Sequence, residues 1–252
     1  MNRTILPILV VFVPVLACGN LPQDDPPQEP RVLVFSKTMG YRHASIEPGI
    51  EAIRGMGEAK GFAVDATEDA AVFESDTLES YGAVIFLSTT RDVLDVAQQD
   101  GFRRYIQAGG AFVGVHAASD TEYDWPWYGR LVGGYFSSHP NDPNVREGTV
   151  LVADPTHTST SMLPSPWVRE DEWYDLRDLA PDLHVLLNID ETTYKRPEED
   201  PRPEPRPIAW YHPYDGGRSW YTALGHTSES FREPLFLEHL WGGIRYALGG
   251  EL

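Results

Sequence analysis

A short apolar segment of this chain leads straight into two side chains that can ionise or bind a metal. Residues 109–115 read GGAFVGV, a composition typical of a buried strand, and His116 and Asp120 follow in a turn of small residues. A buried strand, a glycine beside its exit and a reactive side chain at the tip form the layout of a nucleophile elbow. A histidine stands here where covalent catalysis needs a serine or cysteine, so this site performs a different reaction or none.

Other side chains of suitable chemistry lie at separate places along the chain. Neutral imidazole and carboxylate groups suit general acid–base catalysis and also bind divalent metals. We predict that the catalytic groups are His116, Asp120 and Glu172. The side chains predicted to contact substrate are Arg42, His43, Thr89, Trp125, Trp127, His139 and His226. No local spacing such as His-x-x-x-His indicates a metal, so a divalent transition metal is a hypothesis, with ligands drawn from His43, His116, His139 and His226.

The two tryptophans are included because sugar rings have apolar C–H faces that pack on aromatic rings, while their hydroxyls need a polar rim. Structural interpretations stand beside these assignments. A histidine at a strand end often only makes a hydrogen bond, and half or more of the aromatic rings can be ordinary core. Arg42 can bind an anionic group or pair with a nearby carboxylate. Asp171 can be solvated charge or a residue that orients a histidine.

The pattern of elements predicts how these side chains are positioned. Apolar runs at 31–36, 62–66, 83–87 and 111–115 alternate with helical patterns at 45–60 and 95–107, as in a parallel sheet with helices on both faces. Ligands bind such sheets at the carboxyl ends of the strands. His43, Thr89, His116 and Asp120 all follow strand ends and should therefore converge on one rim.

The second half of the chain is less regular. Alternating segments at 148–153 and 183–189 predict strands, and 207–211 with 218–223 predict a hairpin across a turn at 214–217. Residues 135–140 read as a loop, and residues 233–248 as a closing amphipathic helix.

Composition and the first 30 residues indicate where the protein works. The formal net charge of −18 over 252 residues disfavours nucleic acid as a partner. Residues 1–18 resemble a bacterial lipoprotein signal ending at Cys18, the sole cysteine, although an ordinary secretory signal is the alternative. We expect residues 19–30 to be a flexible tether, residues 31–250 a single domain, and the protein an exported lipoprotein of the bacterial cell envelope, periplasmic or on the outer surface. Its oligomeric state is left open.

Five segments in order along the chain together resemble the ThuA-like (trehalose-utilisation) family, whose fold is that of class I glutamine amidotransferases. They are residues 41–46, 110–120, 127–129 with 136–140, 171–174 and 224–226. The resemblance implies a flavodoxin-like α/β/α sandwich, a mostly parallel sheet with an added antiparallel hairpin, and a link to sugar metabolism. True glutaminases need a thiolate at the elbow, where this chain has His116, so we predict no glutaminase activity.

Two functions of different kinds fit these observations. The leading hypothesis is a lipid-anchored enzyme of carbohydrate catabolism that acts on a small sugar, glycoside or keto-sugar by His/carboxylate acid–base chemistry, with or without a metal. The alternative is a non-catalytic carbohydrate-binding module that kept the cleft and lost the nucleophile. A weaker third hypothesis is a scaffold for a partner enzyme at the cell surface.

Overall fold

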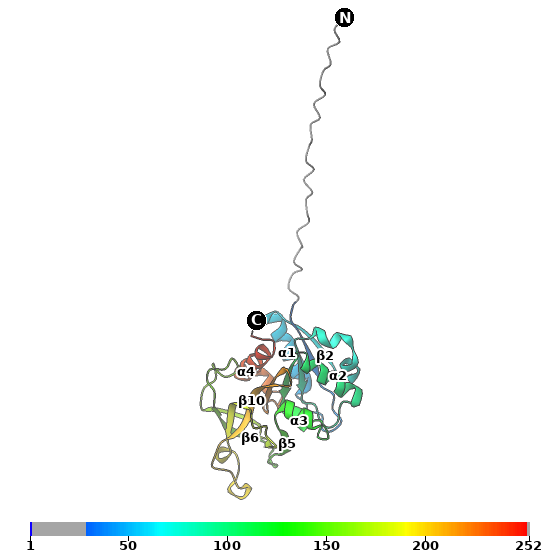
Figure 1. The fold of residues 1–252 in the computed structure, drawn as a ribbon. Coiled ribbons are helices and arrows are strands. Elements are labelled where there is room, and N and C mark those ends of the chain that lie inside the picture. Colours follow the sequence, from blue (N-terminus) through cyan, green and yellow to red (C-terminus); the bar gives the residue numbers. More distant parts are fainter. Residues whose placement is uncertain (2–28, 251–252) are drawn as a thin grey trace.

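The computed structural model describes Met1 and residues 29–250, and a nine-stranded mixed sheet lies at its centre (Figure 1). The strands run in the order β2-β1-β3-β4-β11-β10-β9-β6-β7, and β5 and β8 form a separate two-stranded sheet. The predicted signal segment, the Cys18 lipid site and nearly all of the predicted tether lie outside the described residues. Among the helices of the described residues, none combines the length and the apolar character that crossing a bilayer requires.

The parallel half of the sheet contains five strands, which are β1 (Arg31–Phe35), β2 (Ala63–Thr67), β3 (Ala83–Leu87), β4 (Ala111–Val115) and β11 (Gly217–Thr222). Every residue of β3 and β4 is buried, which is why both read as unbroken apolar runs. The sequence predicted all four strands of the first half to within one or two residues.

Helices cover both faces of this half. They are α1 (Ile46–Lys60), α2 (Val96–Gln107), α3 (Pro126–Val132) and α4 (Pro234–Ala247). Phe102 of α2 and Tyr128 of α3 both pack against Phe86 of β3, so these helices share one face. Helices α1 and α4 both contact the short 3-10 segment Ser230–Arg232, and they cover the opposite face (Figure 1). The predicted three-layer α/β/α sandwich is confirmed.

The remaining four strands extend the sheet beyond β11, each antiparallel to its neighbour. They are β10 (Arg206–Tyr214), β9 (His184–Asp190), β6 (Val145–Val152) and β7 (Trp167–Glu172). The β10–β11 hairpin is confirmed, and its turn places Asp215 at φ 47° and Gly216 at φ 95°, the positive values that tight hairpin turns need. The added antiparallel part is therefore larger than the hairpin that the sequence predicted.

Two elements correct the sequence-based expectation. Strand β7 reads WVREDE and was not predicted, because two of its inward-facing residues, Arg169 and Asp171, are charged and hide the apolar alternation of a strand. The two side chains can be buried because they pair with each other at 3.1 Å. Residues 135–140 were expected to form a loop, but β5 (Tyr135–Ser138) pairs with β8 (Asp175–Arg177). The other short elements are 3-10 segments at Ala70–Glu74, Asp76–Ser80, His116–Asp120, Glu191–Thr193 and Pro197–Glu199.

Candidate active site

The site lies at the carboxyl ends of the parallel strands, and its centre is the residue that follows β4. His116 has φ 52°, a left-handed backbone conformation that is uncommon for a residue with a side chain. The hydroxyl of Tyr221 donates to the His116 carbonyl at 2.9 Å and supports this turn. A Cβ on Gly114 would lie 2.9 Å from atoms of the Phe112 and Tyr221 rings, which explains the glycine before the elbow. The backbone thus forms a sharp elbow carrying an imidazole.

The hydrogen bonds of His116 define its tautomer. Its side chain is fully buried, and Nδ1 lies 2.8 Å from the carbonyl oxygen of Ala223, which can only accept a hydrogen bond. Nδ1 therefore carries the hydrogen, and Nε2 presents a lone pair. That nitrogen lies 2.9 Å from the hydroxyl of Tyr174. Burial, followed by the charge of Glu172, raises the pKa of Tyr174 well above its ordinary value, so Tyr174 keeps its proton and donates it to His116.

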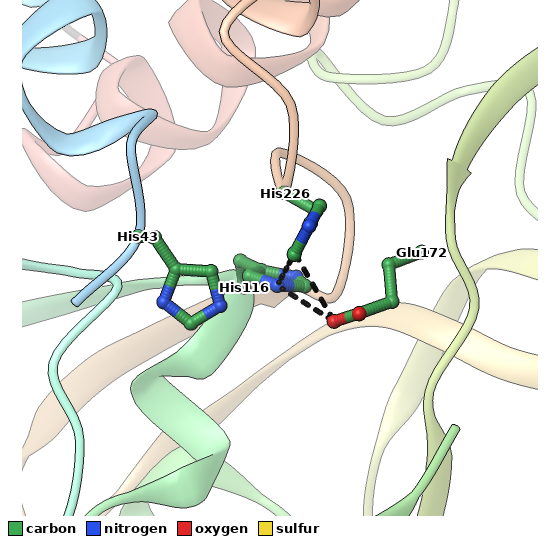
Figure 2. Close-up of side chains that lie close together, drawn as sticks. All are labelled: His43, His116, Glu172 and His226. Atoms are coloured by element: carbon green, nitrogen blue, oxygen red, sulfur yellow. Dashed lines mark hydrogen bonds and ion pairs between the residues drawn. The ribbon is translucent and has the colours of Figure 1, made fainter. Parts of the chain in front are cut away.

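Glu172 and His226 complete a compact cluster with His116 (Figure 2). Oε2 of Glu172 lies 3.5 Å from Nε2 of His116 and 3.1 Å from Nδ1 of His226, and the two ring nitrogens are 3.1 Å apart. Burial would raise the pKa of Glu172, but the nearby charge that His116 can carry and the hydrogen bonds from His226 and Asn144 outweigh that effect and hold the pKa well below its ordinary value. Glu172 is therefore an ionised carboxylate in a nearly dry environment.

His43 comes from the loop after β1 and packs edge-on against the other two imidazoles. Its ring centroid lies 4.8 Å from that of His116 and 5.2 Å from that of His226, and Figure 2 shows the ring turned toward His116. Burial, together with the neighbouring histidines, lowers the pKa of His43 to about 2. Nδ1 of His43 is buried without a hydrogen-bond partner. The side chain therefore stays neutral, with unsatisfied hydrogen-bonding capacity beside the cluster.

The second oxygen of Glu172 faces an open cavity. The side-chain amide of Asn144 donates to Oε1 at 2.7 Å, and Nε2 of His139 lies 3.5 Å from the same oxygen. The His139 side chain is 26% exposed and stands at the mouth of the cavity. The cavity has a volume of about 300 Å³, and its lining residues are Tyr41, His43, Arg91, Asp120, Phe136, His139, Asn144, Glu172, Tyr174 and His226. Glu172 thus connects a buried histidine pair to a histidine that small molecules can reach.

Asp120 lines the same cavity but makes no hydrogen bond to the histidines. Burial raises its pKa, against the opposing effect of the Tyr123 hydroxyl, which donates to it at 2.6 Å. Thr89 follows β3 as predicted, but it is fully buried and does not line the cavity, and its hydroxyl lies 2.8 Å from that of Thr121. Asp120 therefore lies at the cavity wall, whereas Thr89 bonds to the residue that follows Asp120 and does not reach substrate.

Three residues expected at the site lie elsewhere. Arg42 points into solvent and pairs with Glu47 at 2.6 Å and with a second glutamate, so its charge is already matched. Trp125 and Trp127 stack on each other beneath the guanidinium of Arg103, and the indole of Trp127 donates to Asp215 in the turn that precedes β11. That turn lies at the amino edge of the parallel strands, opposite the histidines. The aromatic walls of the cavity are instead Tyr41, Phe136 and Tyr174.

Two contributors to the site were not assigned from the sequence, and a third, Asp171, was left open between solvated charge and a residue that orients a histidine. Tyr174 and Asn144 contact the cluster directly. The carboxylate of Asp171 accepts hydrogen bonds from the backbone N–H groups of Gly225 at 2.9 Å and His226 at 3.0 Å. Asp171 therefore positions the loop that carries His226, acting on its backbone rather than on its ring. Tyr174 stands two residues after Glu172, a proximity that could have indicated it, whereas nothing in the sequence indicated Asn144.

The fold and the elbow define a class: an α/β/α sandwich whose elbow, after β4, presents an imidazole. A family model for ThuA, described as trehalose utilisation, matches residues 31–247, and the chain belongs to the ThuA family. Membership gives the protein a carbohydrate-related role and a sugar-type ligand, as the resemblance implied. No curated protein matches the sequence.

Solved structures show the same fold. A protein described as ThuA-like from Bacteroides uniformis is 22% identical, with a TM-score of 0.72 over 90% of this chain and 95% of that one. A similar protein from Parabacteroides merdae is 19% identical, with a TM-score of 0.70 over 88% and 91% of the two chains. The β-galactosidase from Rahnella sp. R3 is 15% identical, with a TM-score of 0.55, and the match covers 88% of this chain and 31% of the enzyme.

Proposed function

We propose that this protein is an enzyme that transforms a small sugar, glycoside or keto-sugar by acid–base chemistry in the cavity beside Glu172. The observation that carries the proposal is the position of Glu172 between two environments. One oxygen faces the buried pair of His116 and His226, and the other faces His139 at the cavity mouth. An ionised carboxylate between histidines stabilises the positive charge on an imidazole that takes a proton from a bound molecule.

The cavity offers matching surfaces for a sugar. Phe136 and Tyr41 provide aromatic faces for C–H groups, while Asp120 and Arg91 provide polar atoms at the same opening for hydroxyls. His139 is the group best placed to exchange a proton with substrate, because its Nε2 lies beside Glu172 and the ring is partly exposed. Its Nδ1 lies 2.9 Å from the carbonyl oxygen of Pro140 and so carries the hydrogen, which leaves Nε2 as the nitrogen that faces Glu172 and takes part in proton transfer.

The experiment is a turnover assay with a matched pair of variants. The full chain is incubated with trehalose, other disaccharides and their keto derivatives, and products are followed by NMR. Glu172→Gln keeps the shape and removes the charge, so it should lower turnover at least about 100-fold, within the range of a general acid–base contribution. Glu170→Gln makes the same change on the exposed face of β7 and should leave turnover unchanged. Sugar binding without any turnover would refute the enzyme and support the binding module.

We also propose that the protein is exported and anchored through a lipid on Cys18. The apolar run at 5–16 and the single cysteine at its end support this. The test is mass spectrometry of the protein from bacterial membranes. We expect an N-terminal Cys18 that carries acyl groups, whereas an unmodified mature chain in the soluble fraction would contradict the anchor.

A further inference from the structure

We propose that His43, His116, Glu172 and His226 bind one divalent transition metal ion, and that zinc suits this donor set. One ligand atom from each residue lies within 4.8 Å of all the others. Three imidazole nitrogens with one carboxylate oxygen are donors that zinc and neighbouring divalent metals take, whereas calcium and magnesium require mostly oxygen. The set differs from the metal hypothesis drawn from the sequence, because Glu172 replaces His139.

The spacing of three of these atoms matches metal coordination. Tetrahedral zinc with bonds of about 2.0–2.1 Å separates neighbouring ligand atoms by about 3.3–3.4 Å. The distances here are 3.1 Å between the ring nitrogens of His116 and His226, and 3.5 and 3.1 Å from those nitrogens to Glu172 Oε2. An ion about 2 Å from each atom would lie slightly out of their plane. These three side chains could therefore bind an ion without large movement, and His43 stands near enough to supply a fourth ligand (Figure 2).

The protons available to this cluster are few. Because Nδ1 of His116 donates to the Ala223 carbonyl, its Nε2 has only a lone pair to offer. Oε2 of Glu172, 3.5 and 3.1 Å from the two ring nitrogens, is an acceptor as a carboxylate oxygen. Two hydrogens can bridge the set, one on the Tyr174 hydroxyl and one on Nδ1 of His226. A divalent ion would displace both hydrogens: on His116 it would take the lone pair of Nε2 that accepts from Tyr174, and on His226 the Nδ1 hydrogen would leave or move to Nε2.

The supporting contacts are of the kind that hold metal ligands in place. The Ala223 carbonyl accepts from the far nitrogen of His116, which fixes the ring and its tautomer. The amide of Asn144 holds the outer oxygen of Glu172. Asp171 accepts from the backbone of His226 and aligns its loop. The net charge of −18 also raises the local concentration of cations. The cluster is therefore positioned from outside before an ion arrives.

This inference goes beyond the proposed function and does not depend on it. A chain that binds zinc at this cluster and transforms no sugar would refute the proposed enzyme and leave the metal site standing. A chain that transforms a sugar and binds no zinc would do the reverse. The turnover assay and the zinc titration can therefore refute the two proposals independently.

The test is a zinc titration of the full chain after removal of metals with a chelator and dialysis. Isothermal calorimetry should show one equivalent of Zn²⁺ per chain, and Co²⁺ should give the intense visible absorption of a four-coordinate site. His116→Gln and Glu172→Gln should each weaken zinc binding by about 100-fold or more. His184→Gln removes an exposed histidine of β9 and should bind as the parent does.

Two results would overturn the proposal. The first is the absence of stoichiometric zinc binding by the parent chain. That result would show that hydrogen bonds alone hold these four side chains together. This result does not depend on whether any variant folds. The second is unchanged affinity and Co²⁺ absorption in both His116→Gln and Glu172→Gln with native circular dichroism, which places the ion elsewhere.

Discussion

Asp171 links the stability of the fold to the position of the site, and replacing it with asparagine tests that link. The fully buried carboxylate accepts from the backbone N–H groups of Glu172, Gly225 and His226 and pairs with Arg169. Asparagine keeps one acceptor oxygen and turns an NH2 group toward a backbone N–H. One buried donor without a partner costs about 1–3 kcal/mol.

The loss of charge beside Arg169 adds to this cost, although Glu233 remains 3.2 Å from the same guanidinium. We expect Asp171→Asn to lower the free energy of unfolding by about 3 kcal/mol. Urea unfolding followed by tryptophan fluorescence measures it. Glu170→Gln removes the same charge one residue earlier, on the exposed face of β7, and should change stability by less than about 0.5 kcal/mol. Equal urea midpoints for the two variants would refute the role given to Asp171.

Three further predictions use other parts of the molecule. Gly101→Ala places a Cβ 1.9 Å from the Phe73 carbonyl oxygen and should destabilise by about 1–3 kcal/mol, while Gly55→Ala, with no atom within 4 Å, should stabilise by about 0.5–1 kcal/mol in urea unfolding. Burial lowers the pKa of His239 to about 3, so the unfolded chain takes up its proton first as pH falls. The free energy of unfolding is therefore highest above about pH 6.5 and falls toward pH 3, with a loss of about 2 kcal/mol at pH 5 from this histidine. In His239→Gln the free energy of unfolding should fall less across this window, and a pH profile identical to that of the parent would contradict the assignment. Tyr174→Phe loses no proposed metal ligand and should still bind one zinc in calorimetry; loss of binding would show that the phenol is a ligand.

The parallel half of the fold could be predicted because burial on both faces leaves a plain signal. Strands β3 and β4 are apolar throughout, and the helix after Asp95 begins with a side-chain capping box to Gln98. Strand β7 gave no such signal, because its inward residues include Arg169 and Asp171. Their burial depends on pairing with each other and with Glu233 across the structure, and the local sequence does not show those partners.

The same contrast applies to the site. His43, His116 and His226 could be gathered from the sequence because each follows a strand of the parallel sheet, and such strands end at one rim. Asn144 and Tyr174 reach the site from the antiparallel extension, whose path could not be read from local pattern. The tryptophans after Asp120 were misplaced because Glu122, at φ 55°, turns the chain toward α2, where Arg103 covers both rings.

The most direct measurement of the central claim is anomalous X-ray diffraction at the zinc absorption edge, from crystals of the full chain grown with one equivalent of Zn²⁺. We predict a single strong peak about 2 Å from Nε2 of His116, Nδ1 of His226 and Oε2 of Glu172. A peak bound elsewhere, with those three atoms still joined by hydrogen bonds, would contradict the account.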